Sequence, residues 1–274
     1  MWGCFPIYWA FLNHVNPSEV LVHRMLWSVP VLFLLVYSKP SWRMNFKESL
    51  SSKKELVFLF ITAILITINW GGYILAVNLG RVVEASMGYF LSPVINMIGG
   101  YLFFHERISQ LKQLAVLFAT VGALYYVFSG DSFSWLGFLV GFTFSAYGIA
   151  RKAMSSSAVP GLYIETLILL PFFLVFSIWF YSNFDISFLN VDISTDILLF
   201  LAGAVTVVPL ALFNAGAKLL PMTTVGILFL ITPTLQFLVG YVMYGELVNF
   251  NQLLGFTAVW IGLIIYCYAL IKEK

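Results

Sequence analysis

Long apolar runs, separated by short stretches that carry charge, proline or glycine, dominate this chain. A helix needs about 20 apolar residues to cross a hydrocarbon core of about 30 Å. The pattern predicts nine membrane-spanning helices, near residues 19–37, 57–79, 83–104, 113–129, 135–150, 161–181, 196–217, 222–244 and 252–271. The run 135–150 is short, but Trp135 and Tyr147 near its ends fit the aromatic belts of membrane interfaces.

A further apolar segment opens the chain at Met1–Leu12. Twelve residues rise only about 18 Å as a helix, which is too little to span a membrane. The segment lacks the basic start and the small-residue cleavage site of a signal peptide. We therefore expect it to be the second part of a truncated first helix, and the chain to have ten spans.

The basic residues test this count. With ten spans, twelve of the fourteen lysines and arginines lie on one side of the membrane: Lys39, Arg43, Lys47, Lys53, Lys54, Arg107, Lys112, Arg151, Lys152, Lys218, Lys272 and Lys274. The other side holds only Arg24 and Arg81, together with acidic residues such as Asp131 and Glu246. Basic loops favour the cytoplasmic side, so the pattern places both termini in the cytoplasm.

Composition excludes several classes of protein. The chain has 274 residues, 61% hydrophobic and 9% charged, whereas a soluble domain carries about 25% charged residues. A soluble enzyme, a disulfide scaffold, a disordered protein and a nucleic-acid binder are excluded. The net charge of +2 suggests no polyanionic partner. Cys4 and Cys267 lie inside apolar runs, and no phosphate-binding P-loop is present, so we expect no metal, cofactor or ATP hydrolysis.

The chain contains a repeat at an offset of 140 residues. The matched pairs are Pro93 and Pro233, Gly100 and Gly240, Tyr101 and Tyr241, Glu106 and Glu246, Leu114 and Leu254, Gly122 and Gly262, Tyr126 and Tyr266, Ser92 and Thr232, and Asn96 and Gln236. Proline, glycine and glutamate in register are harder to obtain by chance than leucine in so apolar a chain. We expect two repeats, 1–130 and 131–274.

The matched helices are the fourth and the ninth, five spans apart, and an odd number of spans reverses orientation. Inverted repeats are typical of secondary transporters, in which two opposed halves open a central site to either side in turn. The fold predicted is therefore all-α, with ten transmembrane helices arranged as two inverted five-helix repeats.

Motifs over nearly the whole chain resemble the RarD branch of the EamA permeases, in the drug/metabolite transporter superfamily. They are Pro17–Glu19, His23–Ser28, Asn69–Trp70 with Tyr73 and Asn78, Glu84–Phe90 with Pro93, His105–Arg107, Ala217–Pro221, Thr232–Gln236 and Gly245–Glu246. The resemblance implies two inverted five-helix repeats around a central cavity in a bacterial inner membrane. This chain departs from the family at its amino end, where members begin a full first helix.

The second helix carries Glu19, His23 and Trp27 on one face, with Arg24 beside them. Ionisable groups inside a membrane tend to face a cavity or to pair. Two interpretations of Arg24 are open: an ion pair with Glu19 or Glu84, or a place in the outer vestibule of a transport pathway. The histidines lack the spacing of metal ligands, so we expect no metal site.

On the third helix, Asn69 and Tyr73 share a face and Trp70 lies beside them. A buried asparagine needs a partner for its amide. An interhelical hydrogen bond and a ligand contact in the cavity are both open. Trp27, Trp70, Tyr73, Tyr89 and Tyr147 are the candidates for an apolar pocket.

The fourth helix presents a stripe of Tyr89, Pro93, Asn96 and Gly100, and the ninth repeats it as Phe229, Pro233, Gln236 and Gly240. A proline lacks an N–H and removes the bond to the carbonyl four residues earlier. Pro93 and Pro233 either bend these helices for packing or let them flex as gates. Asn96 and Gln236 are candidate ligand contacts.

The carboxylates have simpler interpretations. We expect Glu165 to pair with Arg151 or Lys152, and Glu106 and Glu246 to anchor helix ends. Glu19, His23 and Glu165 are the only plausible titrating groups for proton coupling.

The function predicted is a secondary transporter, not an enzyme, that moves a small organic metabolite or drug-like molecule by alternating access. The substrate and the lipid bilayer are the partners expected, and two repeats in one chain make a monomer sufficient. A channel or passive facilitator is an alternative. A lipid-modifying membrane enzyme is a weaker one, because Asp192 and Asp196 have no histidine near them.

Overall fold

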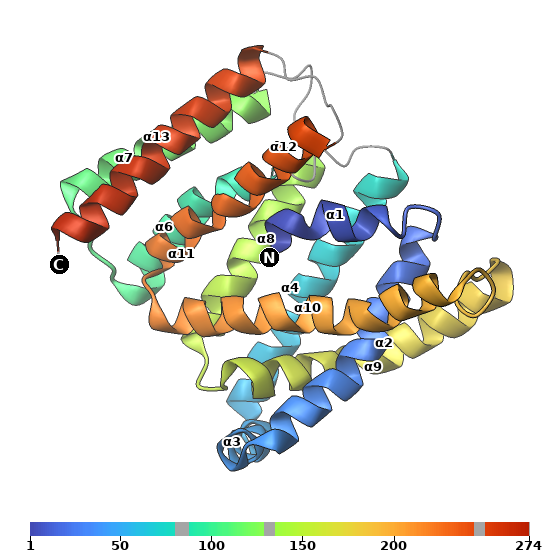
Figure 1. Ribbon diagram of the computed structural model, residues 1–274. Helices are drawn as coiled ribbons and strands as arrows, with labels where there is room; N and C mark the ends of the chain where they lie inside the picture. The colour runs from blue at the N-terminus through green and yellow to red at the C-terminus, as the bar shows by residue number, and fades with distance from the viewer. Residues whose placement is uncertain (80–87, 129–134, 244–249, 274) are drawn as a thin grey trace. The chain divides into compact units, whose positions relative to one another are not determined.

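The computed structural model describes residues 1–79, 88–128, 135–243 and 250–273, and within these ranges the chain forms helices and no strand (Figure 1). The elements are η1 (Trp2–Cys4), α1 (Phe5–Ala10), α2 (Pro17–Ser38), α3 (Pro40–Ser51), α4 (Lys53–Asn78), η2 (Gly88–Leu91), α6 (Ser92–Phe104), α7 (Gln110–Phe128), α8 (Trp135–Ala153), α9 (Ala158–Asn183), α10 (Ile193–Leu219), α11 (Met222–Phe229), α12 (Ile231–Met243) and α13 (Phe250–Lys272).

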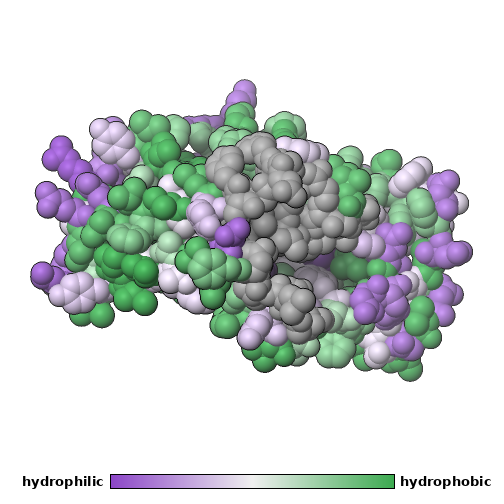
Figure 2. Space-filling view, turned by 90° about the horizontal axis from the view of Figure 1, so that it is seen from above, coloured by the Kyte–Doolittle hydropathy of each residue, from purple (hydrophilic) through white to green (hydrophobic). Residues whose placement is uncertain are grey.

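Among the described residues, six helical stretches are long and apolar enough to cross a membrane: Pro17–Ser38, Lys53–Tyr73, Ala158–Asn183, Ile193–Leu219, Met222–Met243 and Leu253–Lys272. Their outward faces are apolar as well. On α9, Phe172, Val175 and Ile178 are 59%, 69% and 67% exposed, and Figure 2 shows hydrophobic side chains over much of the visible surface. Exposed apolar surface on this scale is expected where lipid replaces water.

Two elements differ from the sequence prediction. The stretch between the first two long spans, expected to be a charged connection, contains the helix α3. The predicted single helix 222–244 is divided at Leu230 into α11 and α12. Pro233 is the third residue of α12 and lacks the N–H that would bond the Phe229 carbonyl, which explains a break at this point.

The chain divides into two compact units. The first comprises residues 1–6, 66–149 and 219–274, and the second comprises residues 7–65 and 150–218. Both units draw on both halves of the sequence. The predicted boundary between repeats, near residue 130, lies outside the described residues.

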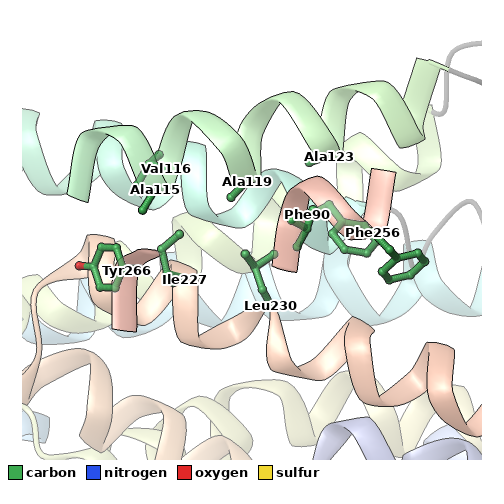
Figure 3. Packing of buried hydrophobic residues seen from close by; sticks show 10 residues of the cluster. Phe90, Ala115, Val116, Ala119, Ala123, Ile227, Leu230, Phe256 and Tyr266 are labelled. Atoms are coloured by element: carbon green, nitrogen blue, oxygen red, sulfur yellow. The ribbon is translucent and has the colours of Figure 1, made fainter. Parts of the chain in front are cut away.

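The core of the first unit is built on α7 and α13, which pack along stripes of small residues (Figure 3). Ala115, Ala119 and Ala123 of α7 are buried, and Phe90, Ile227, Leu230 and Phe256 pack around them. Inside a membrane, small side chains let helix backbones approach closely and gain dispersion energy.

The closest approaches between α7 and α13 repeat themselves. A Cβ placed on Gly122 would lie 2.6 Å from the Gly255 carbonyl oxygen and 2.8 Å from the Val259 nitrogen. A Cβ placed on Gly262 would lie 2.6 Å from the Ala115 carbonyl oxygen and 2.8 Å from the Ala119 nitrogen. Adding 140 to 122, 115 and 119 gives 262, 255 and 259, so each contact becomes the other when the two helices are exchanged.

Candidate functional site

Four aromatic rings from four separate elements meet in the first unit. Phe144 of α8 lies with its ring centroid 5.0 Å from that of Phe229 of α11 and 5.9 Å from that of Tyr89 of η2. The Trp2 ring lies 5.5 Å from Phe144 and 5.6 Å from Phe229. Tyr147, which is fully buried, lies 6.3 Å from Phe144. Edge-to-face rings at these distances attract one another, and the cluster brings together two of the predicted residues, Tyr89 and Tyr147.

Polar atoms without a partner lie on α6, one turn beyond the cluster. Ser92 and Asn96 are 1% and 3% exposed, and within the described residues the Ser92 Oγ and Asn96 Oδ1 atoms have no hydrogen-bond partner. Their spacing of four residues places them on one face of α6. A Cβ on Gly226 of α11 would lie 3.0 Å from the Asn96 Cβ, so this face of α6 lies against α11. Buried polar atoms are normally bonded, and these are free to accept a bond from a ligand.

The two candidate hinge prolines occupy similar places. Pro93 is the second residue of α6 and follows the 3-10 turn η2, and Pro233 is the third residue of α12 and follows the break at Leu230. Each therefore lies just after an interruption of regular helix rather than inside one. Both prolines are buried.

Gln236 and Asn69 are both hydrogen-bonded to backbone. The Gln236 Nε2 atom donates to the Trp2 carbonyl at 3.3 Å, which ties α12 to the aromatic cluster. The Asn69 Nδ2 atom of α4 donates to the Val140 carbonyl of α8 at 2.7 Å. Of the two interpretations of Asn69, the interhelical hydrogen bond is present. Tyr73 packs with Tyr89 against the buried cluster of Ala76, Leu136 and Val140, and Trp70 is half-buried.

The remaining candidates, His23, Arg24 and Trp27, lie in the second unit. The His23 Nδ1 atom accepts a bond from the Trp27 indole N–H at 3.0 Å, and its Nε2 atom lies 3.1 Å from the Tyr181 hydroxyl. Nδ1 accepts, so the proton of neutral His23 is on Nε2 and points to Tyr181. The Arg24 Nε atom donates to the Thr206 hydroxyl at 3.0 Å.

The acidic side chains near these residues have structural roles. The Glu19 carboxylate accepts bonds from the backbone N–H groups of Ser187 and Phe188 at 2.9 Å. Glu165 pairs with Arg151 at 3.4 Å and accepts a bond from Thr62 at 2.5 Å, which confirms the predicted ion pair with Arg151. Glu84, the other predicted partner of Arg24, lies outside the described residues.

The two aspartates considered for a membrane enzyme also hold backbone. The Asp192 Oδ1 atom accepts from the Thr195 N–H and the Ser194 hydroxyl, each at 2.7 Å, at the start of α10. These hydrogen bonds hold the pKa of Asp192 below its ordinary value. The Asp196 Oδ1 atom accepts from the Leu189 N–H at 2.7 Å. Both carboxylates serve the helix start and its loop.

Comparison with known proteins decides the family. The model of the EamA-like transporter family matches residues 1–128. The uncharacterized transporter YojE of Bacillus subtilis is 35% identical over 276 residues, covering 100% of this chain and 92% of the relative. The protein RarD of Escherichia coli is 34% identical over 269 residues, covering 97% and 90%. This chain belongs to the RarD subfamily of the EamA family.

A solved crystal structure has the same fold. It superposes with a TM-score of 0.72 at 14% identity, covering 100% of this RarD-family chain and 94% of the other. At that identity the likeness concerns the fold alone. Relatives named as transporters place the chain among multi-pass membrane transporters of small molecules.

Sequence reasoning missed several residues of the site in this RarD-family protein. Trp2 lies in a segment too short to be assigned a position, and Thr206 and Tyr181 are common side chains in apolar helices. Phe144 lies three residues before Tyr147 on α8, so its helical spacing to a candidate was the available signal.

Proposed function

We propose that this protein is a secondary transporter that moves a small organic molecule by alternating access, as a monomer built from two inverted five-helix repeats, 1–130 and 131–274. The chemical class proposed is a metabolite or drug-like molecule with an aromatic or apolar part. Both termini lie in the cytoplasm, and the membrane is a bacterial inner membrane.

The exchange of contacts between α7 and α13 carries this proposal. Gly122 meets Gly255 and Val259 as Gly262 meets Ala115 and Ala119. The start of α10 at Ile193 also lies 140 residues after the start of α4 at Lys53. A two-fold relation between antiparallel halves produces this pattern, and such halves suit a carrier that opens to each side in turn.

The aromatic cluster and the polar face of α6 are the proposed substrate site. Tyr89, Phe144 and Phe229 offer ring faces, while Ser92 and Asn96 offer unpaired oxygens. Asn69, Trp70, Tyr73, Tyr147 and Gln236 complete this site, and His23, Arg24 and Trp27 form the proposed vestibule. Pro93 and Pro233, at interruptions of two helices, are the proposed hinges.

Labelling tests the inverted repeat. Gln110 of α7 and Phe250 of α13 lie 140 positions apart and are exposed. Q110C and F250C, each in a chain with Cys4 and Cys267 replaced by alanine, should react with a membrane-impermeant maleimide from opposite sides. Q110C should react in inverted vesicles and F250C in intact spheroplasts. Labelling of both from one side would refute inversion.

Flux tests the carrier mechanism. A thermal-shift screen of small organic metabolites on the purified protein supplies a ligand, and the protein is then reconstituted into liposomes. A carrier gives saturable uptake that is accelerated by unlabelled ligand inside. An uptake rate that rises linearly with external ligand concentration and does not change with internal ligand would favour a channel.

A further inference from the structure

One face of the helix α3 packs within the second unit. Asn45, Phe46 and Ser49 lie at helical spacing on that face. The Asn45 Oδ1 atom accepts from the Ser157 N–H at 2.7 Å, the Ser49 hydroxyl donates to Ser156 at 3.1 Å, and the Phe46 ring lies 5.3 Å from that of Tyr163. Figure 1 shows α3 end-on beside one end of α2, so α3 runs across the direction of that span.

The exposed side of α3 is cationic. Lys39, which precedes the helix, is followed at steps of four residues by Arg43 and Lys47, and all three are exposed. We call these three residues the basic stripe. Residues at this spacing form one row along a helix. Lys53 and Lys54, just beyond α3, are exposed as well.

Little acidic charge offsets the basic stripe. Between residues 39 and 55, Glu48 is exposed, whereas Glu55 is buried and its carboxylate accepts bonds from the backbone N–H groups of Ser155 and Ser156 at 3.1 and 2.9 Å. The negative charge of Glu55 is therefore engaged by the loop before α9. The outer surface of α3 and its flanks has a marked excess of positive charge.

Apolar side chains lie beside the basic stripe. Met44 and Leu50 are 60% and 42% exposed, and the Lys39 Nζ atom lies 4.4 Å from the ring centroid of the half-buried Trp42. A helix with basic and apolar surface side by side, next to the end of a membrane span, has the composition of a helix lying in the interface. Tryptophan is enriched at the same depth.

We propose that α3 lies in the plane of the membrane interface and that its basic stripe binds the phosphates of anionic phospholipid headgroups. The apolar side chains Met44 and Leu50 reach toward the acyl chains, and Arg43 and Lys47 lie at headgroup level. This interaction is additional to the proposed transport and does not depend on it. The partner is lipid rather than a soluble anion, because the apolar side chains flank the cations.

Lipid retention tests the proposal. The full chain is purified in neutral detergent, offered equal amounts of phosphatidylglycerol and phosphatidylcholine, and the bound lipids are counted by native mass spectrometry. Each basic residue near an anionic surface contributes roughly a fivefold preference, so R43Q/K47Q should lose about thirtyfold in preference for phosphatidylglycerol. R43K/K47R keeps both charges and should retain it.

R107Q/K272Q is the matched control, because it removes two exposed charges outside α3 and should leave the preference unchanged. Equal preference in R43Q/K47Q and the unmodified protein, or an equal loss in the control, would overturn the proposal. Displacement of phosphatidylglycerol by the same concentration of inorganic phosphate would also overturn it, since the site would then be one for a free anion.

Discussion

Glu106, just beyond the end of α6, accepts a hydrogen bond of 2.8 Å from the backbone N–H of Met222, the first residue of α11. The chain reaches this position because His105 adopts φ 52° and ends α6, while the Glu106 N–H bonds the Gly100 carbonyl at 3.0 Å. Residues 116 apart in sequence are thereby joined at a helix start. A carboxylate at the positive end of a helix is favourable both as a cap and by the helix dipole.

Replacing Glu106 by alanine should therefore destabilise the protein. The loss of the cap on α11 should cost about 1–2 kcal/mol of unfolding free energy. The measurement is reversible unfolding in mixed micelles of mild detergent and dodecyl sulfate. E48A, at an exposed glutamate of α3, is the control, and its change in unfolding free energy should be near zero. Equal stability of E106A and the unmodified protein would show that Glu106 does not hold α11.

The matching contacts of α7 and α13 predict that G122A and G262A lose similar amounts of stability. G122A and G262A each place a methyl group against backbone atoms of the other helix, and such overpacking costs about 1–3 kcal/mol. Because the two closest backbone contacts have the same distances in both environments, 2.6 and 2.8 Å, the two costs should be similar. Nothing lies within 4 Å of a Cβ on Gly216 of α10, so G216A should be neutral or slightly stabilising. A large difference between G122A and G262A would argue against the two-fold relation.

Much of the fold was predictable because one signal dominates it. Apolar runs long enough to cross a bilayer can only be helices or strands of a closed barrel, and the described helices other than α3 lie within or around the predicted runs. The helix α3 was not predicted. Its twelve residues mix charged side chains such as Arg43 and Lys47 with apolar ones such as Trp42 and Met44, so the segment reads as a charged connection between spans. The break at Leu230 was not predicted because the apolar run continues across it without interruption.

The site was predictable only where a side chain stood out chemically. Asn96 and Arg24 are conspicuous in apolar helices, and Tyr89 was found through its place on the stripe with Pro93. Trp2 and Phe144 are two of many aromatic residues, and only tertiary packing shows that they touch. Hydrogen-bond partners such as Val140, which contributes only a backbone carbonyl to Asn69, leave no trace in sequence.

Removing one partner of the ion pair of Arg151 and Glu165 should lower the free energy of unfolding strongly. Replacing both partners by apolar side chains should lower it much less. Their side chains are 0% and 1% exposed, and removing one partner from a buried pair typically costs 3–5 kcal/mol. R151M and E165L should each lose stability in this range, and R151M/E165L should lose much less than the sum. The pair of Lys112 and Glu273, at 2.6 Å, has side chains 20% and 30% exposed; it is the control, and K112Q should change stability little. An additive double variant would refute coupling.

The stability contributed by Asp192 should depend on pH. Hydrogen bonds from Thr195 and Ser194 keep the pKa of this carboxyl below its ordinary value in the folded protein. A lowered pKa in the folded state means that the stabilisation is complete above the unfolded pKa, and is lost as pH falls through the folded one. D192A should thus be less stable than the unmodified protein at pH 7, and the difference should begin to shrink as pH falls below about 3.9, the ordinary aspartate value, and disappear only below the lower pKa of the folded state. Melting scans of D192A and the unmodified protein across this pH range provide the measurement, and a difference that stays constant with pH would contradict this role of Asp192.

Asn96 and Asn69 both belong to the proposed substrate site and are buried to the same extent, 3% exposed, on helices of one unit, but their amides differ in hydrogen bonding. Asn69 donates to Val140, so N69L should lose about 1 kcal/mol of stability. In the part of the chain that the structure describes, the Asn96 Oδ1 atom has no partner. Leucine of similar size removes this unsatisfied buried acceptor, so N96L should be as stable as the unmodified protein or more so. If that oxygen serves a ligand, N96L should lose the ligand-induced thermal shift found in the screen even though its own melting temperature does not fall. A stable N96L that binds the ligand unchanged would remove Asn96 from the substrate site, and a destabilised N96L would mean that the oxygen is engaged within the protein.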